Sequence, residues 1–276
     1  MKNQNSLGTE KLSALARQLG GSCTFPFSQG RAFVVADALE RHSESHKDGR
    51  WNDQGKMYKM VLFGKQKGLG TQEEMGGVCA TIASFWTVFH AKAEDGIQGF
   101  TRGRSVWDYL FDSQGNLNLG AAQNIVIEQH RSCGNQLNHI EAFMQKFNMV
   151  RRTKTTCGTE LHMRFIPFTP ASCMGCAKAI GQLNGYKLIQ LKKTPNGSGS
   201  GHMVAAWYDG QDILFMDPNY GEFWLPNIQA FQQWLTQYRT NLYKKYCSMR
   251  VHTFVKQRVQ AKGRRSGGPF GGLAGG

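Results

Sequence analysis

Apolar residues recur at helical spacing in two long stretches of the chain. The first stretch predicts an amphipathic helix over residues 77–93, and the second predicts a helix over residues 228–242. The repeating positions of the first helix are Val78, Ile82, Phe85 and Phe89. Those of the second are Ile228, Phe231, Leu235, Tyr238 and Leu242. Shorter helices are expected over residues 10–19, 32–42, 119–131 and 136–147.

Strand-like runs occupy the region between residues 159 and 216. The runs 159–168 and 186–191 predict strands, and the apolar and aromatic runs 202–208 and 213–216 predict two more. Asp209-Gly210 separates the last two runs and is a strong signal for a two-residue hairpin turn.

The hairpin signal sets a register for the two runs that flank it. With Asp209 and Gly210 as the turn, Tyr208 faces Gln211 and His202 faces Asp217. Directly opposed residues have Cβ atoms about 4.5–5.5 Å apart, a separation that lets a carboxylate hold an imidazole. A plain polar pair at the open end of a hairpin is the alternative.

Cys79 lies in the first turn of the helix predicted over residues 77–93. The positive end of the helix dipole and the free N–H groups of the first turn lower the pKa of a thiol there. Gly76 and Gly77 precede it and let another backbone approach closely. The alternative is that Cys79 is a small buried apolar residue, as free cysteines commonly are.

Together the three side chains suit nucleophilic catalysis. A thiol becomes an effective nucleophile when an imidazole takes its proton, and a carboxylate orients that imidazole. Cys79, His202 and Asp217 supply these three groups in chain order.

Three short strings carry a resemblance to a known family. They are Gly77-Val78-Cys79, then Gly201-His202 followed by Val204-Ala205, and then Asp217-Pro218-Asn219 with Gly221-Glu222-Phe223. In this order they resemble the YopT-type cysteine peptidases, a papain-like family of bacterial virulence effectors. The resemblance implies an α+β, papain-like fold in which a nucleophile helix packs against an antiparallel β-sheet. It also implies Cys79 as nucleophile, His202 as general base and acid, and Asp217 as the residue that orients His202.

Papain-like enzymes add a side-chain amide to the oxyanion hole, upstream of the nucleophile. Gln72 is the amide in the stretch before the nucleophile, from Thr71 to Met75, and is the candidate for this role. An exposed loop glutamine is the alternative. The resemblance implies no cofactor.

Length and composition suit one large domain with an extension, or two small domains. The 276 residues divide into an accessory N-terminal region (1–70), a peptidase domain (71–255) and a basic, Gly-rich, disordered tail (256–276). No apolar run approaches the roughly 18–20 residues that span a bilayer, and the start has no Sec signal peptide. We therefore expect secretion without a Sec signal and delivery into the host cell cytosol.

Two features suggest other classes of function. Cys173-Met174-Gly175-Cys176 has the spacing of half a zinc site, but no second pair of ligands follows at standard spacing, so structural thiols are favoured and no metal is expected. A net charge of +14 suits nucleic-acid binding. No helix-turn-helix, RNA-recognition or zinc-finger signature accompanies that charge, so no nucleic-acid partner is expected.

The charge is unevenly placed. Residues 223–276 hold nine Lys or Arg and no acid, and residues 142–208 hold nine and one acid. Residues 73–112 hold six acids against three bases, and residues 209–222 hold four acids and no base. This pattern predicts an acidic cleft on a basic body, which suits a basic peptide at an anionic membrane surface. The basic membrane-bound tail of a Rho-family GTPase is such a substrate.

The sequence thus predicts a cysteine peptidase that acts on a host protein. Deamidation or acyl transfer on a host protein by the same three residues is the first alternative. A basic nucleic-acid or membrane-binding module with a structural Cys79 is the second.

Overall fold

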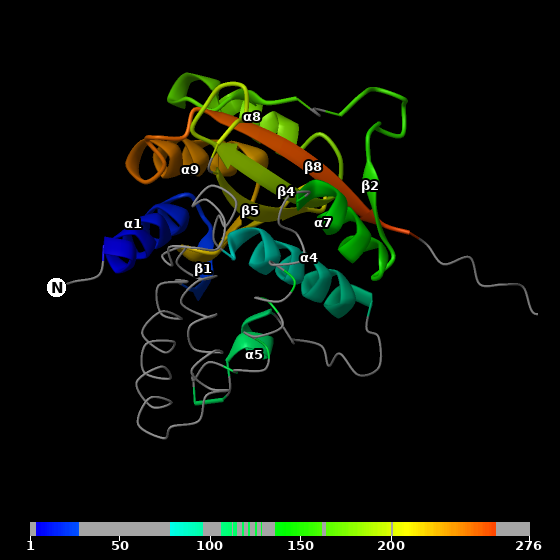
Figure 1. The fold of residues 1–276 in the computed structure, drawn as a ribbon. Coiled ribbons are helices and arrows are strands. Elements are labelled where there is room, and N and C mark those ends of the chain that lie inside the picture. The colour runs from blue at the N-terminus through cyan, green and yellow to red at the C-terminus, as the bar shows by residue number, and fades with distance from the viewer. Residues whose placement is uncertain are drawn as a thin grey trace, which may run out of the picture.

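An antiparallel sheet organises the computed structural model (Figure 1). The structure describes residues 4–27, 78–95, 106–111, 113–114, 118, 121, 125, 128, 136–161, 164–199 and 201–257. Within these residues the strand order is β1-β7-β6-β5-β4-β8-β2, and β3 also pairs with β8. The strands are β1 (Ser22–Pro26), β2 (Met149–Arg152), β3 (Ile166–Pro167), β4 (Gly185–Lys192), β5 (Gly201–Tyr208), β6 (Ile213–Asp217), β7 (Gly221–Leu225) and β8 (Ser248–Lys256).

Helices cover both faces of the sheet. The described helices are α1 (Gln4–Gln18), α4 (Cys79–Asp95), α5 (Val106–Leu110), α7 (Gln136–Gln145), α8 (Cys173–Ile180) and α9 (Ile228–Asn241), with a 3-10 turn η1 (Pro170–Ser172). Figure 1 shows α8 and α9 on one side of the central strands and α4 on the other. The α+β fold class is confirmed, with the helix that carries Cys79 packed against β5 of an antiparallel sheet.

The central strands are buried on both faces, which explains their nearly continuous apolar runs. On β4, Tyr186 and Leu188 pack into the core beneath α4, whereas Ile189 and Leu191 pack into the core beneath α8 and α9. Successive side chains of a strand point to opposite faces, so one run of apolar residues serves both cores.

Most predicted helices and strands are present. α4 and α9 follow the two predicted amphipathic stretches, and Asn227 caps α9 by accepting a hydrogen bond from the Ala230 N–H at 2.8 Å. The strand predicted over residues 159–168 is wrong as a continuous element, since the described residues of that range form β3 and an isolated bridge between Glu160 and Lys154. The sequence did not predict β1, β2, β7, β8, α5 or α8. The helices predicted over residues 32–42 and 119–131 lie wholly or mostly outside the described residues.

The predicted two-residue hairpin is also wrong. β5 and β6 pair with Tyr208 opposite Ile213, so a four-residue loop of residues 209–212 joins them. The Asp209 carboxylate accepts hydrogen bonds from the N–H groups of Gln211 at 2.8 Å and Asp212 at 2.7 Å. This local capping stabilises the longer loop.

The N-terminal residues belong to the same sheet as the candidate site. β1 pairs antiparallel with β7, and α1 packs against β1, β7 and α9. Residues 4–27 therefore pack as part of the sheet structure. The predicted boundary at residue 70 and most of the predicted tail beyond residue 256 lie outside the described residues, and this division stays a prediction.

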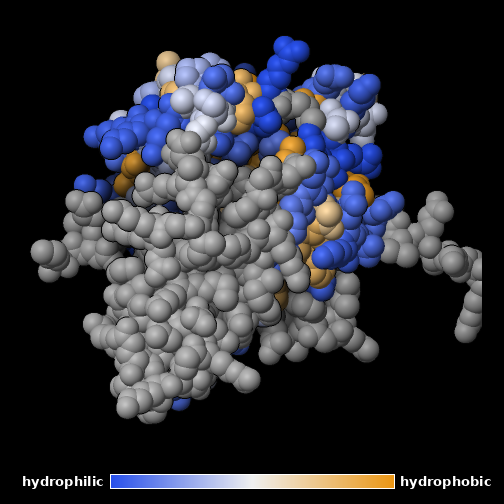
Figure 2. All heavy atoms as spheres, viewed as in Figure 1, coloured by the Kyte–Doolittle hydropathy of each residue, from blue (hydrophilic) through white to orange (hydrophobic). Residues whose placement is uncertain are grey.

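On the face shown in Figure 2, the described surface is mainly hydrophilic. Met174 on α8 is a large hydrophobic residue with 51% of its surface exposed. Among the described helices, none combines the length and the apolar character that crossing a membrane requires.

Candidate active site

Cys79 is the first residue of α4. The carbonyl of Val78 accepts the first helical hydrogen bond, from the Ile82 N–H at 2.9 Å. The N–H groups of Cys79 and of the next residues therefore have no acceptor within the helix and point toward the space in front of it. The thiol, 6% exposed, lies at the positive end of the helix dipole, as the sequence predicted.

His202 lies near the start of β5 and is 5% exposed. Its Nε2 lies 2.8 Å from Oδ1 of Asp217, and its ring stacks on Tyr243 with 5.3 Å between the ring centroids. The ring is also within hydrogen-bonding reach of the Cys79 thiol. Since Nε2 faces Asp217, Nδ1 is the nitrogen that remains for the thiol.

Asp217 ends β6 and is fully buried. Its Oδ1 faces His202 and also accepts the N–H of Asn219 at 2.8 Å. Its Oδ2 accepts the hydroxyls of Tyr238 at 2.8 Å and Tyr243 at 2.7 Å. These hydrogen bonds satisfy the buried carboxylate and fix its position beside His202.

The structure brings Cys79, His202 and Asp217 together although the predicted register is wrong. In the observed register His202 and Asp217 are offset diagonally, because Asp217 is level with Val204. The error is two residues, and a shift of two leaves every side chain on its original face. The two side chains thus remain within hydrogen-bonding distance.

The two ionisable groups of the site shift in opposite directions. Burial alone raises the pKa of Cys79, but the hydrogen bond and charge of His202 outweigh it and the thiol pKa is lowered. Burial alone lowers the pKa of His202, but the charge and hydrogen bond of Asp217 outweigh it and that pKa is raised. These directions favour a thiolate–imidazolium pair at neutral pH.

Three contributors to the site were not singled out from the sequence. Asn219 places its side-chain nitrogen 3.4 Å from Nε2 of His202 and donates to the Tyr243 hydroxyl at 3.0 Å. It follows Asp217-Pro218 in one of the quoted strings, which was the available signal. Tyr238 was expected only as an apolar position of α9, and nothing in the sequence marked Tyr243.

Glu222, also in a quoted string, holds α4 to the sheet. Its carboxylate accepts hydrogen bonds from the indole N–H groups of Trp86 at 2.5 Å and Trp107 at 3.3 Å, and from the Thr24 hydroxyl at 2.6 Å. These partners lie on α4, α5 and β1, whereas Glu222 itself lies on β7. The carboxylate therefore fixes the helix of Cys79 relative to the strands.

Replacing Glu222 by alanine is expected to lower the free energy of unfolding by about 2–4 kcal/mol, because two buried indole N–H groups lose their acceptor. Urea unfolding measures the change. Glu160→Ala, at an exposed position, is the matched control and should stay within about 0.5 kcal/mol of the parent. Equal urea unfolding midpoints for Glu222→Ala and Glu160→Ala would contradict the role of Glu222 in holding α4 to the sheet.

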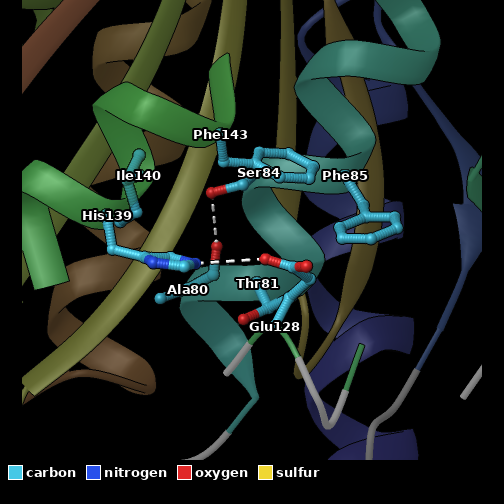
Figure 3. A pocket seen from close by; sticks show the side chains of 8 residues that line it. All are labelled: Ala80, Thr81, Ser84, Phe85, Glu128, His139, Ile140 and Phe143. Atoms are coloured by element: carbon cyan, nitrogen blue, oxygen red, sulfur yellow. Dashed lines mark hydrogen bonds and ion pairs between the residues drawn. The ribbon is translucent and has the colours of Figure 1, made fainter. Parts of the chain in front are cut away.

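A shallow hollow adjoins the residues that follow Cys79 (Figure 3). Figure 3 shows the His139 ring and the Glu128 carboxylate pointing toward each other there, with 3.1 Å between Nε2 and Oε2. The other lining residues are Ala80, Thr81, Ser84, Phe85, Ile140 and Phe143. The hollow therefore belongs to the surroundings of the candidate site.

Gln72, the candidate for the oxyanion hole, lies outside the described residues.

The two cysteines of the Cys-x-x-Cys string are buried at the start of α8. Sγ of Cys173 donates to the carbonyl of Thr169 at 3.2 Å, and Sγ of Cys176 donates to that of Pro167 at 3.3 Å. Burial raises the pKa of both thiols, that of Cys176 to about 12. Both are therefore protonated thiols at neutral pH, far less nucleophilic than Cys79.

The acids of residues 209–222 do not make the cleft acidic, so this part of the charge prediction is wrong. Asp217 is buried beneath its four donors, and Glu222 is bound to two indoles. Asp209 and Asp212 lie in the loop at the end of β5 opposite to His202. The acids of residues 73–112 lie mostly outside the described residues.

Comparison with solved structures finds two partial likenesses. The crystal structure of the Pseudomonas avirulence protein AvrPphB is 13% identical and covers 64% of this chain and 91% of its own, with a TM-score of 0.40. The crystal structure of the YopT domain of the Pasteurella multocida PfhB2 toxin is 16% identical and covers 84% of this chain and 90% of its own, with a TM-score of 0.30.

Comparison of sequences finds virulence proteases and a family. The cysteine protease YopT of Yersinia pestis and that of Yersinia enterocolitica are each 24% identical over 176 residues, which are 58% of this chain and 49% of the relative. The chain thus spans about half the length of the curated relatives it matches. A family model, Peptidase_C58 (Yersinia/Haemophilus virulence surface antigen), matches residues 16–258. The resemblance read from the three quoted strings is therefore confirmed, and the chain belongs to this YopT-type peptidase family.

Proposed function

We propose that this chain is a cysteine peptidase that uses Cys79, His202 and Asp217. The observation that carries the proposal is the His202 ring, held by Asp217 at 2.8 Å on Nε2 and within reach of the Cys79 thiol on its other side. The family assignment and the lowered pKa of Cys79 support it.

The reaction follows from the positions of these atoms. The Cys79 thiolate attacks the carbonyl carbon of the scissile peptide bond, and the N–H of Cys79 at the start of α4 donates to the oxyanion. His202 then gives its proton to the leaving amine, and the C–N bond breaks. In the second step His202 takes a proton from water, the hydroxide attacks the thioester, and the thiolate leaves.

We propose a host-cell protein as the substrate. The similar proteins include the cysteine protease YopT of Yersinia pestis, and the matching family model is described as a virulence surface antigen, which supports this proposal. Secretion without a Sec signal into the host cytosol is part of this proposal. The basic tail of a Rho-family GTPase is a candidate substrate, and binding to an anionic membrane is a candidate device for reaching it.

Mapping of protein termini in a eukaryotic cell lysate tests the proposal. The wild-type chain is expected to create new termini that the Cys79→Ala variant does not create. Cys157→Ala, which changes an exposed thiol, is the control and should create the same termini as the wild type. A mass shift of about one dalton on glutamine residues without new termini would instead indicate deamidation. Unchanged proteins would favour a binding module.

A further inference from the structure

A lysine side chain lies across the strand that carries His202. Lys192 is the last residue of β4 and pairs with Gly201, the residue before His202. A Cβ atom at Gly201 would lie 2.8 Å from Cδ and 3.0 Å from Cε of Lys192. The aliphatic part of Lys192 therefore occupies the space that a side chain at residue 201 would need.

The ammonium group of Lys192 is held beside the start of β5. Its Nζ donates to the carbonyl of Gly199 at 2.5 Å, and two of its N–H donors remain. Lys192 shares a face of the sheet with Met203, on the side of the sheet where α4 carries Cys79. Burial and the charge of Arg250 lower the pKa of Lys192, whereas the charge of Cys79 raises it.

Arg250 on β8 is a second cation on this face of the sheet. It pairs with Gln190, which lies two residues before Lys192 on β4 and on the same face. Its guanidinium lies over the Phe165 ring, 4.0 Å from the ring centre, and its Nε is buried with no hydrogen-bond partner among the described residues. His252 is the next residue on the same face of β8. It is buried, and its Nδ1 also has no hydrogen-bond partner among the described residues.

Positive charge is therefore in excess on this face. Three described carboxylates around the site already have partners: Asp217 faces His202, Glu141 is bound to Arg151, and Glu128 faces His139. A partly desolvated cation without a carboxylate gains most from an incoming anion, because water competes weakly there.

We propose that Lys192 and Arg250 form a cationic wall of the cleft that selects a peptide with an acidic side chain beside the scissile bond. This inference rests on the proposed peptidase function and names its substrate class. The Asp or Glu carboxylate accepts the free N–H donors of Lys192, with Arg250 adding charge attraction. An acidic peptide is opposite in charge to the basic Rho-family tail named above as a candidate substrate, so the cleavage sites decide between the two.

Alkylation of Cys79 tests the wall without any peptide substrate. Iodoacetate and iodoacetamide react at the same sulfur but differ in charge. In Lys192→Met, the ratio of the iodoacetate rate to the iodoacetamide rate is expected to fall about three- to tenfold. Lys178→Met removes the same charge from an exposed position on α8 and should leave the ratio unchanged. An unchanged ratio in Lys192→Met, whether or not both rates fall together, would overturn the proposal.

The cleavage sites provide the second test. Sites cut by the wild type should carry Asp or Glu within two residues of the scissile bond, and Lys192→Glu should shift them toward Lys or Arg. Sites without acidic enrichment, or unmoved by the reversal, would refute the substrate class. If no protein is cut but the alkylation ratio falls in Lys192→Met, the peptidase function fails while the cationic wall stands.

Discussion

Replacing Cys79 by serine is expected to lower kcat for peptide cleavage about 10⁴- to 10⁶-fold. A hydroxyl at this position is a far weaker nucleophile than a thiolate, and its pKa lies too high for His202 to ionise it in the resting enzyme. The exchange changes one buried atom, so the free energy of unfolding should change by less than about 1.5 kcal/mol. Cleavage of a protein substrate and thermal unfolding are the measurements.

Cys157→Ser is the matched control for this prediction, because that thiol is exposed in a loop. It should retain the wild-type rate and stability. Cleavage by Cys79→Ser at more than about a tenth of the wild-type rate would contradict a nucleophilic role for Cys79, whatever the effect of the other variants.

Replacing Asp217 by asparagine is expected to lower kcat about 10²- to 10⁴-fold. The change removes the charge that raises the pKa of His202, so the imidazolium and the thiolate that it stabilises are lost together. Asp217→Ala should in addition lower the free energy of unfolding by about 2–5 kcal/mol, because the buried hydroxyls of Tyr238 and Tyr243 lose their acceptor. Glu10→Gln, at an exposed position, controls for the change in charge.

The pH dependence of Cys79 alkylation gives Asp217→Asn a readout that a structural role would not move. In the wild type the pKa of Cys79 is lowered and that of His202 is raised, so the ion pair exists between these two values. Asp217→Asn should narrow this window by lowering its alkaline limit. A window of unchanged width would argue against Asp217 as the residue that orients and charges His202.

The charge of His202 also links stability to pH. Its pKa is raised in the folded chain above the ordinary 6.5, so the stability that it contributes is fully present below about pH 6.5. That contribution is lost as the pH rises through the raised value. In Asp217→Asn this alkaline loss of stability should shift to lower pH.

Local patterns determined the elements that carry the site. A helix needs only its own apolar period, so the sequence placed Cys79 at the start of α4 and marked α9 without any tertiary information. The order of Cys79, His202 and Asp217 and the three strings around them were sufficient to identify the family. These signals can be read without a structure because each depends only on residues that are close together in the sequence.

Contacts between distant segments were decided by the tertiary structure alone. The four-residue loop between β5 and β6 is held by Asn184, whose side-chain nitrogen donates to the carbonyl of Asp209 at 2.6 Å, and dipeptide preference cannot distinguish that loop from a two-residue turn. The acids of residues 209–222 counted as charge in the sequence, but folding buried Asp217 and bound Glu222 to two indoles. Lys192 reaches the site only because β4 pairs with β5 and residue 201 is a glycine. Charge and side-chain type are properties of the sequence, whereas the partner of each charge is set by packing.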